Sequence, residues 1–250
     1  MKIYEIMGCS RSGHHTILNW IVMNHVGFQS DWEFKMTTLG ANGFHFLSEA
    51  NHDIPISHKF LDEKKENIST ILIGYEDTPA NYTILNEDRI YKGPFALDYF
   101  YQYNIEHKGR IILIRDFYNN LSSRIKSNEK TLFTKWSSGK PFLFDVGEKF
   151  IYRWKNQARD CVNNKCLFLK FEDWINNKDV RDKFLFDAFG LKDLYSTKEI
   201  RGTVSSFGTI ENVEKRSEQV EIPEETKELI RKDSELNYLI GALGYQYKDL

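Results

Sequence analysis

Short apolar runs alternate with amphipathic helical patterns along the whole chain. Four runs are predominantly apolar, as is typical of parallel strands buried on both faces; they are Ile3–Met7, Thr70–Tyr75, Arg110–Ile114 and Cys166–Phe171. Pro55–His58 is a shorter, fifth candidate strand. Helices are predicted at Thr16–His25, Phe117–Ser127, Lys149–Asn163 and Val180–Phe189, and from Pro223 to about Ile240. This alternation predicts a three-layer α/β/α sandwich around a mainly parallel sheet.

Two long segments between these elements, Asp31–Ile54 and Thr134–Gly147, are rich in glycine and aromatic residues without a clean period. Loops of this length often act as lids or binding loops, so we expect ligand recognition there, with plain irregular surface as the alternative. No repeat or linker interrupts the 250 residues, which predicts one domain over 1–250. Ligands of such folds bind at the carboxyl ends of the strands, so the residues that follow each strand are the candidates for function.

The composition, with 41% hydrophobic and 28% charged residues, is that of an ordinary globular protein. A net charge of −2 argues against a general nucleic-acid-binding surface, so an anion site must be built locally. Cys9, Cys161 and Cys166 lack the spacing of metal ligands and cannot all pair, which favours a reducing compartment. With no signal-peptide pattern and no apolar run of about 18 residues, we expect a cytoplasmic protein without a membrane span.

A glycine-bounded loop, Gly8-Cys-Ser-Arg-Ser-Gly13-His-His-Thr16, follows the first predicted strand. Backbone N–H groups of such a loop converge with those of the next helix, whose dipole favours an anion. Arg11 adds a positive charge that does not titrate. His14 stands where a nucleotide-hydrolysing P-loop carries its lysine after the second glycine. The loop therefore predicts a phosphate cradle of a different kind, with a ligand-free strand–helix turn as the alternative.

A second candidate lies at the end of the third predicted strand. Arg115 follows this strand, and Ser123 lies eight positions later in the next helix. A strand-end cation and a hydroxyl two turns into the helix can bind one phosphate together. A strand-end arginine is as often a salt-bridge partner, so this pair alone does not define a site.

Together these segments make the chain resemble the sulfotransferases that use 3′-phosphoadenosine 5′-phosphosulfate (PAPS). That family binds the 5′-phosphosulfate with a [KR]-S-G-T-[TS] loop, to which Arg11-Ser12-Gly13-His14-His15 is similar. It binds the 3′-phosphate with an R-x7-S element, to which Arg115 and Ser123 correspond. Two later segments also resemble the family, LKFEDW at Leu169–Trp174 and RGTVSSFG at Arg201–Gly208, and the GHH pattern is similar to bacterial-type members.

The resemblance implies a P-loop-like fold and transfer of a sulfuryl group from PAPS to a hydroxyl or amine, with carbohydrates among the acceptors and adenosine 3′,5′-bisphosphate as product. It implies no metal. Arg11 is implied to stabilise charge during the transfer. Where the family has two hydroxyls this chain has His14 and His15, whose imidazoles can donate to the same oxygens. The residues implied to bind the donor are Ser10, Arg11, Ser12, Gly13, His14, His15, Thr16, Arg115, Ser123, Arg201, Ser205, Ser206 and Phe207.

The catalytic base has two candidates. His58, in Ile56-Ser-His-Lys-Phe60, resembles the strand-end histidine of many sulfotransferases, and its ordinary pKa near 6.5 suits a base. Glu76 follows a strongly apolar strand and is the alternative, since some carbohydrate sulfotransferases use a glutamate. A structural role for His58 stays open, and His45, His52 and His58 do not have the spacing of metal ligands.

Two other functions remain open at this stage. The glycine spacing of GCSRSGHH also suits a nucleotide kinase or NTPase, although the missing lysine argues against it. A catalytically silent PAPS-binding module would bind the donor without transferring the sulfuryl group. We expect PAPS and a small-molecule or glycan acceptor as partners, whereas the sequence indicates neither the acceptor's identity nor the oligomeric state.

Overall fold

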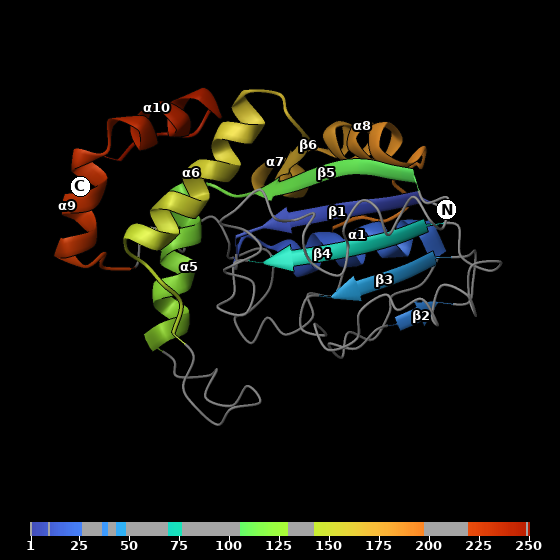
Figure 1. The fold of residues 1–250 in the computed structure, drawn as a ribbon, viewed down its shortest axis with the longest axis horizontal. Helices are drawn as coiled ribbons and strands as arrows, with labels where there is room; N and C mark the ends of the chain where they lie inside the picture. The colour runs from blue at the N-terminus through green and yellow to red at the C-terminus, as the bar shows by residue number, and fades with distance from the viewer. Residues whose placement is uncertain are drawn as a thin grey trace.

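A mainly parallel sheet forms the centre of the molecule (Figure 1). The computed structural model describes residues 2–9, 11–26, 37–39, 44–48, 70–76, 106–129, 143–197, 220–248 and 250. The six strands within these ranges lie in the order β2-β3-β4-β1-β5-β6. β1 pairs in parallel with both β4 and β5, and β2 runs antiparallel to β3. Their bounds are β1 Lys2–Gly8, β2 Thr37–Leu39, β3 Phe44–Ser48, β4 Thr70–Glu76, β5 Glu106–Ile114 and β6 Leu167–Lys170.

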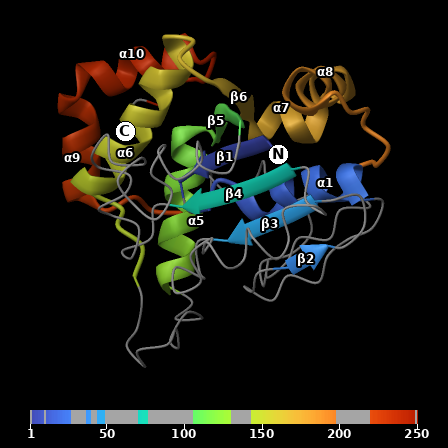
Figure 2. The same ribbon diagram turned by 45° about the vertical axis from the view of Figure 1, so that its right-hand side comes forward.

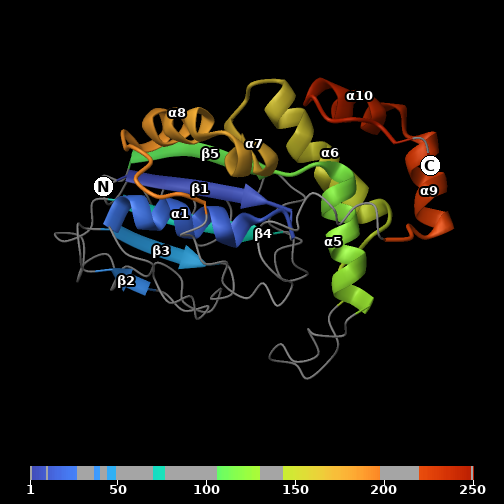
Figure 3. The ribbon, with the colours of Figure 1, turned by 180° about the vertical axis from the view of Figure 1, so that it is seen from behind.

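Helices cover both faces of this sheet. Figure 3 shows α1, α7 and α8 together on one face, and Figure 2 shows α6, α9 and α10 grouped on the other side of the molecule. Because successive strand residues point to opposite faces, Ile111 and Leu113 of β5 pack with the first group, whereas Ile112 and Ile114 pack with the second. The helices are α1 His14–Val26, α5 Phe117–Glu129, α6 Glu148–Val162, α7 Phe171–Asn176, α8 Lys178–Phe189, α9 Glu224–Lys232 and α10 Ser234–Ala242.

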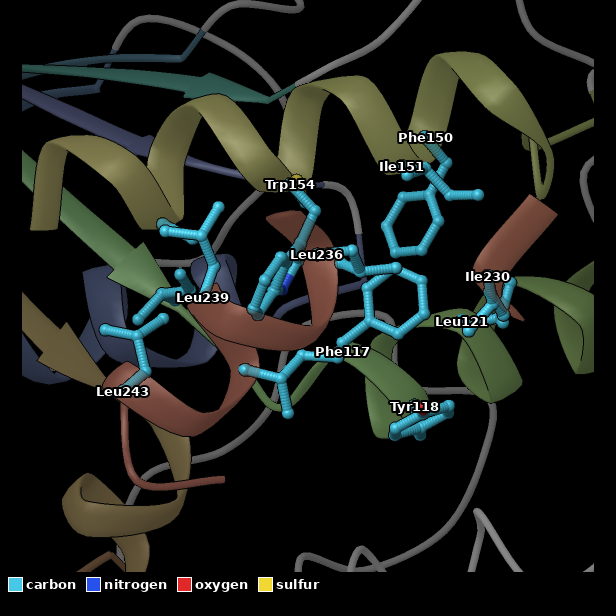
Figure 4. Close-up of a cluster of buried hydrophobic side chains, with 14 of the residues drawn as sticks. Phe117, Tyr118, Leu121, Phe150, Ile151, Trp154, Ile230, Leu236, Leu239 and Leu243 are labelled. Carbon is cyan, nitrogen blue, oxygen red and sulfur yellow. The ribbon is translucent and has the colours of Figure 1, made fainter. Parts of the chain in front are cut away.

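The second group of helices closes over a core of aromatic rings (Figure 4). Phe117 of α5 stacks on Phe150 of α6, with ring centroids 5.3 Å apart, and meets Trp154 edge-on at the same distance. Such ring pairs stabilise a core beyond the area that they bury. The rings hold α5, and with it the end of β5, against α6.

On the opposite face a buried carboxylate joins α1 to α8. Trp20 Nε1 donates to Asp193 Oδ1 at 2.8 Å, and Arg181 Nε donates to Asp193 Oδ2 at 2.7 Å. Both partners of this ion pair are buried. A buried charge of this kind is stable only when it is paired and hydrogen-bonded, as Asp193 is. The contacts fix the axis of α1, the helix that begins at the glycine-bounded loop.

The predicted fold class is confirmed: the protein is an α/β sandwich with helices on both faces of a mainly parallel sheet. The four predicted strands and the first four predicted helices form, with ends that differ by a few residues. Phe171 is an exception, because it begins α7 rather than ending β6. Pro55–His58 lies outside the described residues.

Two other predictions are wrong. The segment Asp31–Ile54, interpreted as a long loop without regular structure, contains the short strands β2 and β3, while the ligand recognition expected there stays a prediction. The helix expected from Pro223 to Ile240 is divided into α9 and α10. Asp233 separates them because its carboxylate accepts a hydrogen bond from Leu236 N at 2.9 Å and starts a new helix. Within the described ranges, no helix combines the length and apolarity needed to cross a bilayer.

Candidate functional site

The loop between β1 and α1 has the backbone of an anion-binding nest. Arg11 and Gly13 both adopt left-handed conformations, with φ of 71° and 86°. A hydrogen bond from Ser12 N to Cys9 O at 3.0 Å tightens the turn, and Ile17 N donates to Gly13 O at 3.1 Å as α1 starts. Left-handed residues on either side of Ser12 turn successive backbone N–H groups toward one concavity. The first turn of α1 contains no acidic side chain, so nothing there opposes an anion.

Both glycines of the loop are required by close packing. A Cβ on Gly8 would lie 2.9 Å from Ser12 Oγ and 3.0 Å from Leu113 O. A Cβ on Gly13 would overlap the ring of Phe171. Ser12 is buried, and its Oγ has no hydrogen-bond partner among the described residues, so it keeps a hydrogen to donate. These features fit an oxyanion held by the loop.

Arg115 brings the second predicted segment into contact with this loop. Its Nη1 donates to Arg11 O at 2.9 Å, across 104 residues of sequence. Its guanidinium lies 4.9 Å above the ring of Phe171, and its Nε is 4.0 Å from Glu172 Oε1. Only 3% of Arg115 is exposed, and Trp154 Nε1 donates to its carbonyl at 2.9 Å. A cation that never titrates is thus fixed beside the nest.

A carboxylate network surrounds the end of β5. Glu172 accepts from Asp116 N at 3.2 and 3.3 Å and from Tyr245 Oη at 3.1 Å. Asp116 Oδ1 accepts from Asn119 N at 2.8 Å and begins α5. Burial, helped by the neighbouring Glu172 carboxylate, raises the pKa of Asp116 to about 6. A carboxyl group that titrates near neutral pH therefore lies next to Arg115 in the chain.

The structure describes some of the other predicted residues with their side chains, some by their backbone alone, and some not at all. Ser123 is buried on α5, two turns after Arg115, and Thr16 is half-buried in the first turn of α1. His15 and Glu76 are placed by their backbone alone, His15 in α1 and Glu76 opposite Gly8 in the β1–β4 register. The predicted residues outside the described ranges are Ser10, His58, Arg201, Ser205, Ser206 and Phe207.

His14 has a structural contact that sequence reasoning did not anticipate. Its ring is 2% exposed, and Nε2 lies 3.1 Å from Ile6 O, a geometry in which Nε2–H donates to the carbonyl. The ring also lies beside Gly8, since a Cβ there would be 3.2 Å from His14 Cδ2. His14 therefore packs against β1 and the start of the loop. A direct contact between His14 and the donor stays a prediction.

Glu172 holds a neighbouring backbone amide and an arginine in place, through its contacts with Asp116 N and Arg115. Phe171 and Tyr245 were missed as parts of the site. Phe171 was assigned to a strand, so its contact with Gly13 could not be foreseen. No feature of the sequence signals that Tyr245, beyond the last helix, returns to Glu172.

Comparison with solved structures relates this arrangement to a known fold. The chain is similar to a sulfotransferase domain from the curacin biosynthetic pathway, with a TM-score of 0.50 over 98% of both chains and 14% sequence identity. The chain has a sulfotransferase-type fold. No protein-family model matches the chain, and no curated protein matches its sequence. The likeness to the sulfotransferase domain concerns the fold alone.

Proposed function

We propose that this protein is a PAPS-dependent sulfotransferase that transfers a sulfuryl group to a hydroxyl or amine. The observation that carries the proposal is the hydrogen bond from Arg115 Nη1 to Arg11 O. This bond places the Arg115 cation beside the anion-binding nest. A donor with phosphate groups at both its 5′ and 3′ positions needs two such anion sites close together. The sulfotransferase-type fold supports this assignment.

In this proposal each segment of the site has a separate task. The nest, Ser12 Oγ and the Arg11 guanidinium bind the phosphosulfate and stabilise the charge that develops on the leaving phosphate. Arg115 and Ser123 bind the 3′-phosphate. The loop containing Arg201, Ser205, Ser206 and Phe207 covers the adenosine. The bound donor supplies the activated sulfuryl group, and the permanent cations supply the charge compensation.

The acceptor proton is taken by a base at the carboxyl end of the sheet. His58 is our first candidate by resemblance, and Glu76 is the alternative. The register places the backbone of Glu76 directly beside Gly8, which keeps it at the edge where the loop begins. Comparing the pH–rate profiles of His58→Gln and Glu76→Gln assigns the base, because the base variant loses the limb that the other retains.

The test of donor binding is calorimetry with adenosine 3′,5′-bisphosphate and adenosine 5′-phosphate. The wild-type protein should bind the bisphosphate more tightly. Arg115→Gln should remove about 10- to 100-fold of that affinity, the loss of one charge-assisted contact, and leave the monophosphate less affected. Arg231→Gln is the matched control, since Arg231 pairs with exposed Glu224 on α9.

Equal affinities for the two nucleotides in the wild-type protein would overturn the donor assignment. Magnesium-dependent release of phosphate from ATP would favour the kinase or NTPase alternative. Tight binding of the bisphosphate without transfer from PAPS to any acceptor would favour the silent binding module.

A further inference from the structure

A cavity lies where the strands begin, at the opposite end of the sheet from the proposed donor site. It is an open cleft of about 680 Å³ formed where β1, β5 and β6 begin and α8 ends. In Figure 1 the strand arrows point to the left, and β1 starts on the right beside the N-terminus. A β-bulge between Ile3 and Glu5 shifts the pairing of β1 with β5 here. Gly109, with φ of 103°, has nothing within 4 Å of an added Cβ, so the backbone leaves the cleft open.

The cleft is strongly basic. Four cationic side chains line it, Lys2, Lys108, Arg110 and Lys165, against a single acidic one, Asp187. Asp160 stands behind two of them, with its carboxylate 3.8 Å from both Arg110 Nη1 and Lys165 Nζ. The balance of charge attracts small anions although the whole chain has a net charge of −2.

Cys166 also lines the cleft, and a second thiol, Cys161, is buried near the end of α6. Lys165 N donates to Asp160 O at 3.0 Å and Asn164 N to Cys161 O at 3.1 Å, with Asn164 at φ of 53°. This is a Schellman cap, which reverses the chain at a helix end. It returns Cys166 to Cys161, and Cys166 packs against the core cluster that contains the Cys161 side chain.

The two thiols have different surroundings. Cys161 is 1% exposed, and the interaction with the Cys166 thiol together with burial raises the pKa of its own thiol. The interaction with Cys161 lowers the pKa of Cys166. Partial burial and Asp160 oppose this shift and Arg110 adds to it, and the net direction is downward. Cys166, at the cleft, is therefore the thiol that ionises first, and the buried Cys161 keeps its proton. Cys9, by contrast, is buried, and its Sγ donates to Gln157 Oε1 at 3.4 Å.

We infer that Cys166 and Cys161 form a dithiol site that reduces a small anionic disulfide bound in the basic cleft. The Cys166 thiolate attacks one sulfur of the disulfide, forming a mixed disulfide and releasing one thiolate. Cys161 then loses its proton to the second leaving sulfur and bonds to Cys166. The protein gains one intramolecular disulfide, and the small disulfide becomes two thiols. This inference is independent of the proposed sulfuryl transfer.

Oxidised glutathione, whose carboxylates suit a basic cleft, is the probe for the full chain. Mass spectrometry should show a product lighter by two hydrogen atoms, with Cys161 and Cys166 joined. Cys161→Ala should instead accumulate a glutathionyl adduct on Cys166, and Cys166→Ser should give neither product. Cys9→Ala is the control and should react like the parent. An adduct on Cys9, or no adduct in Cys161→Ala, would overturn the assignment of the thiols.

The charge of the disulfide tests whether the cleft binds anions or whether Cys166 is merely accessible to any disulfide. At low salt the reaction with oxidised glutathione should be at least about tenfold faster than with cystamine, a cationic disulfide. Lys108→Gln and Lys165→Gln should reduce this ratio, and added salt should reduce it too. Lys232→Gln, which removes an exposed cation of α9 that is neither in the cleft lining nor paired with a lining residue, is the matched control. Equal rates for both disulfides would overturn the anion-binding part of the inference.

Discussion

Gly13 shows how one residue can be required for two reasons at once. Its φ of 86° lies in the region that side chains disfavour, and the ring of Phe171 fills the space where a Cβ would lie. Gly190, after α8, has a similar φ of 71° but nothing within 4 Å of an added Cβ. The two positions therefore separate backbone strain from steric overlap.

Gly13→Ala should destabilise the protein by about 3 kcal/mol or more, because overlap with Phe171 adds to the backbone strain. Gly190→Ala should cost about 1 kcal/mol, the strain alone. Urea unfolding of both variants measures the difference. Similar losses in the two variants would show that Phe171 can move aside.

Asp116 carries a testable pH dependence. Its folded pKa of about 6 lies above the ordinary 3.8, so the native state holds a proton that the unfolded chain releases. Stability from this group therefore falls as the pH rises from about 4 to 6, and the full cost is present above that window. Asp116→Asn keeps an acceptor for Asn119 N and should raise the free energy of unfolding at pH 7 by up to about 3 kcal/mol.

The same variant should flatten the unfolding free energy between about pH 4 and 6 when measured by denaturant titration. Asp179→Asn, at an exposed position in the first turn of α8, is the control and should change neither quantity much. A larger pH dependence in Asp116→Asn would contradict the assigned pKa direction.

At this scale the sequence predicted types of residue better than their contacts. Arg11 and Arg115 were recognisable because each lies shortly after an apolar run that predicts a strand. The structure brings the two residues into contact. The contact of His14 with Ile6 O was not predictable, because ring orientation depends on packing between elements. The same holds for Tyr245 and its hydrogen bond to Glu172.

Among the elements, the junction of α9 and α10 concentrates several interactions in one side chain. Asp233 caps α10 through Leu236 N and also accepts from Lys155 Nζ of α6 at 3.0 and 2.8 Å. It therefore stops one helix, begins the next and binds both to α6. The sequence suggested a single helix because Lys232-Asp233-Ser234 contains no glycine or proline.

Asp233→Ala should destabilise the protein by about 1–3 kcal/mol, through loss of the cap and of the charge-assisted contact with Lys155. Glu228→Ala, which removes an exposed i,i+4 pair with Lys232, should change stability by no more than about 0.5 kcal/mol. Thermal unfolding of both variants compares them directly. Equal shifts would mean that Asp233 contributes no more than a surface charge.

Long elements were predicted well because their patterns extend over several turns or a full apolar run. β2 has three residues and β3 five, which is too short for a period to emerge. The strand ends were also less certain than the strands themselves. Phe171 continues an apolar run although it begins α7, since hydrophobicity alone does not mark where a strand ends.

For the whole molecule, the fold class followed from alternation, whereas the strand order did not. β1 lies between β4 and β5, and β6 is on the edge, an order that no local pattern encodes. Contact between the loop and Arg115 depends on this order, because adjacent parallel strands place their carboxyl ends side by side. The site is thus a property of topology as well as of residues.

Donor binding should stabilise the whole molecule by mass action. Adenosine 3′,5′-bisphosphate at about 100 times its Kd should add about 2.7 kcal/mol to the free energy of unfolding. Arg115→Gln should lose most of this gain at the same ligand concentration, while Arg231→Gln keeps it. Thermal unfolding with and without ligand gives the comparison, and a gain of equal size in Arg115→Gln would exclude Arg115 from the donor site.

The central place of β1 has a consequence for biosynthesis. β1 emerges from the ribosome before either neighbour in the sheet, since β4 begins at Thr70 and β5 at Glu106. Sheets built from such distant segments fold slowly, and unpaired apolar strands tend to associate with other chains. β1, which precedes the glycine-bounded loop, therefore stays unpaired until β4 and β5 have been synthesised. The nascent chain is thus the form of this protein that most needs protection by chaperones.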